Sequence, residues 1–250
     1  MANEFFAPGA QRATKVRSLF DQIAHKYDLL NDIQSLGFHR FWKRKVVRLT
    51  NAKRGDRALD LCCGTGDIAQ RLGQAGAQIV GLDFSSGMLT LAAKRLQDAR
   101  DHDSIHVCFV RGDAQQLPFE QSTFDIITMG YGLRNLADWQ KGVEEIRRVL
   151  RPGGRIVLLE FGRPESAVWR TLYFGYLKLA VPLLGLVFHG APGTYSYILE
   201  SLKHYSGPGA VAEKLRNLGL VEVTNYNILG GAMTITYGTL PTENRIRQNC

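Results

Sequence analysis

Cysteine is scarce in this chain, which has only Cys62, Cys63, Cys108 and Cys250 among its 250 residues. Two of them are adjacent, and the spacing matches neither a disulfide framework nor a zinc site. Structural disulfides belong to oxidising compartments, so their absence is typical of the reducing cytoplasm. The sequence therefore predicts a cytoplasmic protein without a disulfide framework and without a metal centre.

Long apolar runs are also lacking. The longest, residues 172–188, is about one turn short of a membrane-spanning helix, and Lys178, Pro182 and two glycines interrupt it. Residues 1–12 contain no apolar core of the kind found in a secretory signal peptide. We expect neither a transmembrane span nor a signal peptide.

The overall composition is that of a soluble globular protein, with 45% hydrophobic and 22% charged residues. This balance excludes a disordered chain, a collagen-like chain, a coiled coil and a polytopic membrane protein. Lysine and arginine number 31 against 23 aspartates and glutamates, so the formal net charge is +8. Such an excess favours an anionic partner, whether nucleic acid, membrane surface or acidic ligand, and does not choose among them.

Strand and helix patterns alternate along most of the chain. Helical spacing covers residues 16–49, and five strands are predicted at 57–61, 78–83, 105–111, 123–129 and 155–161. Helices are predicted at 67–72, 86–100 and 139–150, the last ended sharply by the Arg-Pro-Gly-Gly sequence at 151–154. A helix at 210–218 and two strands at 222–228 and 233–238, joined by a Gly-Gly turn, close the pattern.

This alternation predicts an α/β fold of right-handed βαβ units. The expected architecture is a Rossmann-like, doubly wound, mostly parallel sheet with an antiparallel C-terminal hairpin strand, N-terminal helices and a helical insertion after the fifth strand. We interpret residues 1–250 as one domain, in which 1–50 form an N-terminal helical cap and 165–206 an apolar insertion on the substrate side.

A glycine loop between the first strand and the following helix is the first candidate site. Gly64 and Gly66 flank Thr65, Ala69 completes a G-x-G-x-x-A pattern, and Asp83 ends the next strand. Glycines let the backbone approach a ligand, and a carboxylate at that position can accept two ribose hydroxyls. The pattern does not separate a dinucleotide from another adenosine cofactor. A tight strand-to-helix turn with Asp83 as a helix cap is the alternative.

Further acids favour S-adenosylmethionine over a dinucleotide. Asp60 and Asp67 flank the glycine loop, where they would repel a pyrophosphate but suit the cationic amino and sulfonium groups of adenosylmethionine. Asp113 and Ala114 follow the third strand, where an acid can accept the adenine amino hydrogen and apolar residues can wall the ring. Asp113 could instead be an ordinary turn residue.

With these motifs, the chain resembles class I adenosylmethionine-dependent methyltransferases. More narrowly, it resembles the menaquinone and ubiquinone C-methyltransferase family, whose members methylate a ring carbon of demethylmenaquinol or of a polyprenyl-methoxy-benzoquinol. The resemblance runs from about Val16 to Gly238. It rests on the segments Lys26–Asp32, Ser35–Arg44, Asp60–Asp67, Gly132–Asn135, Arg148–Gly154 and Leu159–Phe161.

The resemblance implies cofactor contacts at Thr65, Asp83, Asp113 and Ala114. Gly64, Gly66, Phe84 and Gly130 complete the expected cofactor site. Some members have a serine near the cofactor at the position of Gly130, and because glycine has no side chain, this chain would contribute only a backbone contact there. The chain also departs from the family pattern at Leu30, Gln34, Arg151 and Gly162. These departures leave open which quinol is the substrate, but they remove no group that the chemistry needs.

Methyl transfer to a quinol carbon needs a neighbouring phenolate, and a phenol ordinarily has a pKa near 10. Arg134, at the end of the fourth strand, could stabilise that phenolate, and Asn135 could orient a ring oxygen or a water. The proton could leave through water to Asp67, His39 or bulk solvent. Alternatively, Arg134 pairs with a surface acid and Asn135 caps the next helix.

The N-terminal helices supply the expected substrate-binding residues Tyr27, Asn31 and His39. Tyr27 and Asn31 share a helix face that we place over the cofactor pocket, with the Tyr27 ring over the sulfonium. A core tyrosine and a structural histidine are the alternatives. The basic run at 43–45 could meet anionic lipid or form a solvated helix face.

The resulting hypothesis is methylation of a prenylated quinol at the cytoplasmic side of the membrane. The favoured reaction is the conversion of demethylmenaquinol to menaquinol. The apolar insertion would line a groove for the prenyl tail or touch the bilayer, or else form core or a homodimer interface. The alternatives are a benzoquinol substrate, another small-molecule methyltransferase, a nucleic-acid methyltransferase and a nicotinamide oxidoreductase. No nucleic-acid partner is expected.

Overall fold

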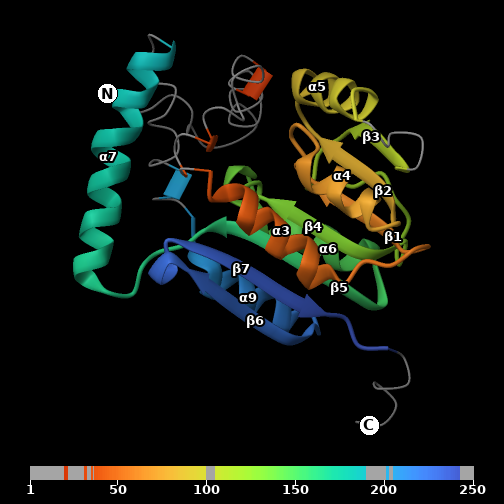
Figure 1. Cartoon of the computed structure of the whole chain (residues 1–250). Helices are drawn as coiled ribbons and strands as arrows, with labels where there is room; N and C mark the ends of the chain where they lie inside the picture. The colour runs from red at the N-terminus through yellow and green to blue at the C-terminus, as the bar shows by residue number, and fades with distance from the viewer. Residues whose placement is uncertain are drawn as a thin grey trace.

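A seven-stranded sheet organises the chain (Figure 1). The computed structural model describes residues 20–21, 31–32, 35, 37–99, 105–189, 201–202 and 205–242, with only the backbone of 180–189. The strands run in the order β3-β2-β1-β4-β5-β7-β6. Their bounds are Arg57–Leu61 for β1, Gln78–Asp83 for β2, Val107–Arg111 for β3, Phe124–Gly130 for β4, Leu150–Phe161 for β5, Val221–Ile228 for β6 and Met233–Thr239 for β7.

The first five strands are parallel, whereas β7 is antiparallel to both β5 and β6. Strand order reverses beside β1, so β2 and β3 lie on one side of it and β4 and β5 on the other. This confirms the predicted doubly wound sheet with an antiparallel hairpin. It also places a topological switch point, the usual ligand site of such sheets, at the carboxyl ends of β1 and β4.

Helices cover both faces of the sheet (Figure 1). Their apolar sides pack in two clusters, one containing Val46, Ile68 and Leu72, the other Val143, Ile146 and Leu215. The helices are α3 (His39–Thr50), α4 (Asp67–Gln74), α5 (Ser86–Gln97), α6 (Trp139–Val149), α7 (Ala167–His189) and α9 (Gly207–Asn217), with short 3-10 turns η4 (Leu133–Asn135) and η5 (Leu229–Gly231).

Strand β5 begins earlier than the sequence predicted. The Arg-Pro-Gly-Gly segment was expected to be a turn between α6 and a strand at 155–161, but β5 already starts at Leu150. Two hydrogen bonds explain the difference: Gly153 N donates to Leu240 O at 2.7 Å, and Leu240 N donates to Gly154 O at 2.8 Å. The chain after β7 thus holds this segment in the sheet, an interaction that local sequence signals do not report.

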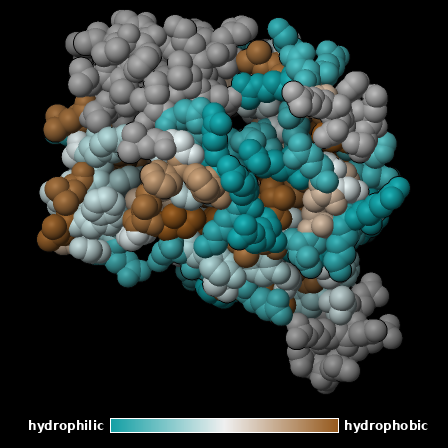
Figure 2. Space-filling view, in the orientation of Figure 1, coloured by the Kyte–Doolittle hydropathy of each residue, from teal (hydrophilic) through white to brown (hydrophobic). Residues whose placement is uncertain are grey.

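The part of the apolar insertion that the structure describes before residue 190 contains one long helix, α7, which lies beside the sheet rather than within it (Figure 1). Tyr173 and Leu177 are buried, whereas Val168, Leu172 and Leu179 are 60–74% exposed. In Figure 2 hydrophobic atoms gather along this side of the molecule. Within the described ranges, no helix is long and apolar enough to cross a membrane.

Candidate active site

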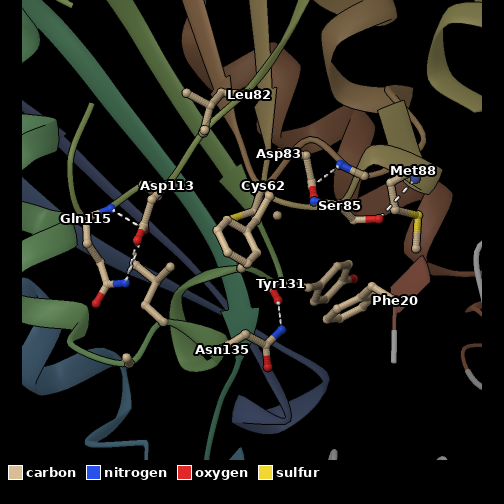
Figure 3. A pocket seen from close by; sticks show the side chains of 18 residues that line it. Phe20, Cys62, Leu82, Asp83, Ser85, Met88, Asp113, Gln115, Tyr131 and Asn135 are labelled. Atoms are coloured by element: carbon tan, nitrogen blue, oxygen red, sulfur yellow. Dashed lines mark hydrogen bonds between the residues drawn. The ribbon is translucent and has the colours of Figure 1, made fainter. Parts of the chain in front are cut away.

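A cleft lies at the carboxyl ends of β1, β2, β3 and β4 (Figure 3). Parallel strands end at one edge of the sheet, so loops that are distant in sequence converge there. The cleft encloses about 780 Å³, including its open mouth. Its lining includes six of the eight residues predicted to bind the cofactor: Gly64, Asp83, Phe84, Asp113, Ala114 and Gly130.

The glycine loop turns tightly into α4. Gly64 and Gly66 both have positive φ, 55° and 81°, and Gly66 N donates to Cys63 O at 2.9 Å. A Cβ atom at Gly66 would lie 3.0 Å from the Phe109 ring, so glycine is required there by both conformation and packing. Thr65 is buried beside it and lines a second cavity, described below.

Asp83 ties the glycine loop to the turn after β2. Its carboxylate accepts hydrogen bonds from Gly64 N at 2.8 Å and Ser85 N at 2.9 Å. Burial raises the pKa of Asp83, and the backbone hydrogen bonds partly oppose this. Helix α5 is capped by Ser85, whose hydroxyl accepts from Met88 N, so the alternative of Asp83 as the cap is wrong. The Asp83 carboxylate instead lines the cleft (Figure 3).

Asp113 lies across the cleft from Asp83 (Figure 3). Its Oδ1 accepts from the backbone N of Gln115 at 2.9 Å and from the side-chain amide at 3.1 Å. The turn role that we kept as an alternative is therefore present, and Asp113 still lines the cleft. Leu82, Met88 and Leu136 add apolar lining, which suits a flat aromatic ring.

Two described residues of the N-terminal region, Phe20 and Asp21, lie in or beside the cleft. Phe20 is part of the lining. Asp21 accepts hydrogen bonds from the Ser85 hydroxyl at 2.5 Å and from Gly87 N at 3.1 Å, and so attaches this region to the start of α5. The sequence predicted that a helix face with Tyr27 and Asn31 covers the pocket, and it did not single out Phe20 or Asp21. The helical spacing of Phe20 was the available signal.

Of the three predicted substrate-binding residues, the two that the structure describes do not line the cleft. Tyr27 lies outside the described residues. Asn31 and His39 line neither the cleft nor the second cavity. His39 is buried, and its Nδ1 lies 2.9 Å from the Ser35 hydroxyl. Burial lowers the pKa of His39, assisted by Lys43, and these surroundings match the structural alternative for this histidine.

Arg134 and Asn135 occupy η4, directly after β4, and only Asn135 lines the cleft. Its amide nitrogen donates to Tyr131 O at 3.1 Å. Its Oδ1 is buried and has no hydrogen-bond partner among the described residues. An acceptor of this kind is costly to bury unless a ligand satisfies it.

The guanidinium of Arg134 is buried behind the cleft lining. It pairs with Glu160 at 2.6 Å, donates to Tyr131 O at 2.8 Å and to the Ser201 hydroxyl at 3.2 Å, and lies 4.6 Å from the Phe161 ring centroid. The alternative of a surface acid partner is thus wrong, because Glu160 is only 3% exposed. Sequence reasoning missed Glu160, since nothing local marks a strand carboxylate as the partner of a distant arginine.

Asp67 is held by two cations. Its carboxylate lies 3.1 Å from Lys43 Nζ and 2.8 Å from Arg71 Nε. Burial would raise the pKa of Asp67, but Lys43 and Arg71 outweigh it and lower that pKa. A carboxylate stabilised in this way is a poor proton acceptor. Lys43, expected in a basic run that faced lipid or solvent, is 7% exposed and faces this acid instead.

A second cavity of about 330 Å³ adjoins the cleft beneath the glycine loop. Asp60 lines it, fully buried, with its Oδ1 accepting from the Thr128 hydroxyl at 2.7 Å. Burial raises the pKa of Asp60 to about 7, although the Thr128 hydrogen bond and Lys43 oppose the shift.

These features fit an adenosyl cofactor. A partly buried carboxylate stands on each side of an apolar slot, the glycine loop allows close backbone approach, and orphaned acceptors on Asp60 and Asn135 face cavities. In the part of the chain that the structure describes, no group of three or more His, Cys, Asp or Glu side chains could hold a metal ion.

Comparison with solved structures shows the fold. The magnesium protoporphyrin IX methyltransferase ChlM from Synechocystis PCC 6803, solved with bound S-adenosylhomocysteine, superposes with a TM-score of 0.66 at 17% identity. The alignment covers 91% of this chain and 99% of that one. The [4+2]-cyclase SpnF matches with a TM-score of 0.62 at 18% identity, over 94% and 97% of the two chains.

Sequence comparison is more specific. The chain is 37% identical over 235 residues to a demethylmenaquinone methyltransferase of Paenarthrobacter aurescens, covering 94% of this chain and 90% of that protein. It is 40% identical to a 2-phytyl-1,4-naphtoquinone methyltransferase of Trichormus variabilis, over 88% and 96% of the two chains. The model of the ubiE/COQ5 methyltransferase family matches residues 9–240. The chain belongs to the ubiE/COQ5 methyltransferase family.

Proposed function

We propose that this S-adenosylmethionine-dependent methyltransferase transfers the methyl group of its cofactor to a ring carbon of a prenylated quinol. Demethylmenaquinol is the first candidate substrate. One observation carries the proposal. Relatives named demethylmenaquinone methyltransferase are 34–38% identical to this chain, and each alignment covers at least 90% of both proteins. Such extensive similarity includes the substrate side as well as the cofactor side.

The cofactor, when bound, supplies a methyl group carried on a sulfonium. We assign the residues that hold it to the cleft and the adjoining loop: Gly64, Thr65, Gly66, Asp83, Phe84, Asp113, Ala114 and Gly130. Asp83 can accept ribose hydroxyls while it keeps the two backbone hydrogen bonds described above. Asp113 can accept the adenine amino hydrogen, and Leu82, Met88 and Leu136 can enclose the ring.

On the substrate side we assign Asn135 to the quinol hydroxyl. Its unpartnered Oδ1 can accept the hydroxyl hydrogen and so orient the ring and draw the proton away from the oxygen. The hydroxyl proton then leaves through water at the open mouth. Asp67 is an unfavourable acceptor because its pKa is lowered.

Arg134 is better assigned as a positioning residue than as a direct stabiliser of the phenolate. Its guanidinium donates to Tyr131 O, and Asn135 Nδ2 donates to the same carbonyl. The Glu160 carboxylate accepts hydrogen bonds from both the guanidinium and the backbone N of Arg134. The ion pair thereby fixes the η4 turn that presents Asn135.

The exposed side of α7 suits the prenyl tail and the membrane surface where such a quinol resides. Val168, Leu172, Tyr176 and Leu179 form a stripe at helical spacing, all of them exposed. Exposure argues against the core alternative for these side chains. We propose peripheral contact with the cytoplasmic membrane face through this stripe; a homodimer across it is the competing hypothesis, and the size of the protein in solution distinguishes them.

A benzoquinol substrate is the second candidate. A relative in Azotobacter vinelandii, 34% identical over 94% of this chain, is named a ubiquinone/menaquinone biosynthesis C-methyltransferase. The two rings differ in size, and the described cleft residues offer no feature that excludes either.

A direct competition assay tests the proposal. Demethylmenaquinol and a polyprenyl-methoxy-benzoquinol, offered together with methyl-labelled S-adenosylmethionine, should give labelled menaquinol as the main product by mass spectrometry. Label in the benzoquinol alone would favour the second candidate. Label in neither quinol, or on oxygen rather than carbon, would refute the assignment.

A further inference from the structure

Both ends of the apolar insertion at 165–206 are fastened beside the active site. Near its first end, α7 buries Tyr173, whose hydroxyl donates to Ala232 O at 3.3 Å. Near its last end, Ser201 is completely buried, and its hydroxyl accepts from Arg134 Nε at 3.2 Å. Neither contact belongs to the cofactor cleft or to the exposed stripe of α7.

The first of these contacts leads to the end of β5. The Ala232 carbonyl that accepts from α7 also accepts from Gly162 N, the residue after β5, at 2.9 Å. A second hydrogen bond, from Trp169 Nε1 to Leu229 O at 2.7 Å, holds α7 to the same η5 turn. Since hydrogen-bonded elements move together, a shift of α7 acts on the end of β5, where Glu160 lies.

The second contact leads to the same place, because it ends on the buried ion pair. Arg134 lies 2.6 Å from Glu160, and the two side chains are 3% and 4% exposed. The same guanidinium contacts Ser201 of the insertion and the carbonyl of Tyr131. Asn135, which lines the cleft, donates to that carbonyl as well. The ion pair is therefore the point at which the insertion meets the turn that presents Asn135.

Aromatic side chains enclose the ion pair. The Phe161 ring centroid lies 4.6 Å from the Arg134 guanidinium. Burial raises the pKa of Tyr173 and of Tyr205, and both phenols lie close enough for the charges of Arg134 and Glu160 to act on that pKa. Both phenols therefore stay neutral, and in such surroundings each hydrogen bond to the pair has a larger effect than it would have in water.

We propose that the Arg134–Glu160 pair couples the insertion to the ring site, so that a prenyl tail bound along α7 speeds methyl transfer by holding Asn135 in position. Ser201 and Glu160 are then positioning residues, since they act on the quinol through Arg134 and Asn135. The inference rests on the proposed methylation of a prenylated quinol. Binding energy from a part of the substrate that does not react raises kcat in this way, and truncated substrates then lose kcat as well as affinity.

Turnover of a tailed and a tailless quinol tests the coupling. In the parent, kcat for prenylated demethylmenaquinol should exceed kcat for the same ring without a tail at least several-fold. Ser201→Ala removes the hydroxyl that accepts from Arg134, so the ratio of these two kcat values should fall roughly 3- to 10-fold, as expected for one typical buried hydrogen bond. The KM for the tailed quinol should change less than about twofold, because the buried hydroxyl does not reach the exposed stripe.

Ser206→Ala is the matched control. It removes a hydroxyl from the same insertion, but this side chain is exposed and makes no capping hydrogen bond to α9. The variant should keep the parent's ratio of kcat values. In both variants the calorimetric affinity for S-adenosylhomocysteine should stay within about twofold of the parent, which reports that the cofactor site is folded.

A double-variant cycle tests whether the two positioning residues act as a unit. Glu160→Gln keeps the shape of the side chain and removes the charge opposite Arg134, so it should lower the ratio at least as much as Ser201→Ala does. The two losses should not add in the double variant, because both substitutions release the same guanidinium.

Four results would overturn the inference. They are equal kcat values for the two quinols in the parent, a ratio in Ser201→Ala no lower than in Ser206→Ala, a raised KM with unchanged kcat in Ser201→Ala, and losses that add in the double variant. Loss of cofactor affinity in Ser201→Ala to the same degree as kcat would contradict it too, because the role would then be structural. Methylation of neither quinol by the parent would instead refute the proposed function.

Discussion

Three aspartates beside the glycine loop show how far residue identity determines chemistry. Asp60, Asp67 and Asp83 were all predicted to lie there, because the carboxyl ends of parallel strands meet at one edge. The structure gives them different electrostatics: burial raises the pKa of Asp60 and of Asp83, while two cations lower that of Asp67. The sequence could not supply this, since the partners Lys43 and Thr128 come from other elements.

Asp83→Asn tests the ribose role at this scale. The substitution removes one acceptor and the negative charge, so the affinity for S-adenosylhomocysteine should fall roughly 10- to 100-fold, in line with about 1.5–3 kcal/mol for one charge-assisted hydrogen bond. Asp138→Asn is the control, because it replaces one good helix cap by another outside the cleft. Unchanged affinity in Asp83→Asn, measured by calorimetry, would remove this residue from the site.

Asp60 should also make folding depend on pH. The unfolded carboxyl loses its proton near pH 3.8 and the folded one near 7, so between these values the folded state binds more protons. The free energy of unfolding therefore falls as pH rises through this range. From pH 5 to pH 8, Asp60→Asn should gain about 2–3 kcal/mol relative to the parent in urea unfolding. Parallel pH profiles for the two proteins would contradict the raised pKa.

At the scale of elements, sequence patterns predicted most strands to within two residues, since apolar alternation and glycine turns are local signals. The start of β5 was missed because its pairing partner is the segment after β7. Helix α7 was predicted as part of a helical, apolar insertion at 165–206, without the face that it buries. Its division into a buried side with Tyr173 and an exposed side with Leu172 depends on where the helix lies against the sheet.

Charged substitutions on the exposed side of α7 test whether this side contacts the prenyl tail. Leu172→Glu combined with Leu179→Glu places two charges on the apolar stripe, where both side chains are mostly exposed. Stability should change by less than about 1 kcal/mol, since surface substitutions rarely cost more than about 0.5 kcal/mol each. The KM for a tailed quinol should rise several-fold, whereas that for a tailless ring should not change.

Thr171→Glu adds a charge at an exposed polar position of the same helix and serves as the control. If it raises KM as much as the double variant does, charge on the helix rather than loss of the apolar stripe is responsible. If the double variant affects tailed and tailless quinols alike, the stripe does not contact the tail.

At the scale of the whole molecule, the fold fixes the cofactor edge but not the reaction. A porphyrin methyltransferase and a cyclase share the architecture at 17–18% identity. We propose that the reaction is chosen by segments added around the sheet, here the N-terminal region that supplies Phe20 and the insertion that contains α7. The sequence predicted these two parts least specifically, because neither follows the alternation of strands and helices that marks βαβ units.

The net charge of +8 gives the prediction for the whole molecule. If the protein contacts a membrane, sedimentation with vesicles containing anionic lipid should exceed that with neutral vesicles at low salt. In 1 M NaCl, where the Debye length is only about 3 Å, that difference should vanish. Binding that remains at high salt is apolar, and Leu172→Glu combined with Leu179→Glu should abolish it. Equal binding to both vesicle types at low salt would show that charge plays no part, and residual binding that survives the glutamates would place the apolar contact elsewhere than α7.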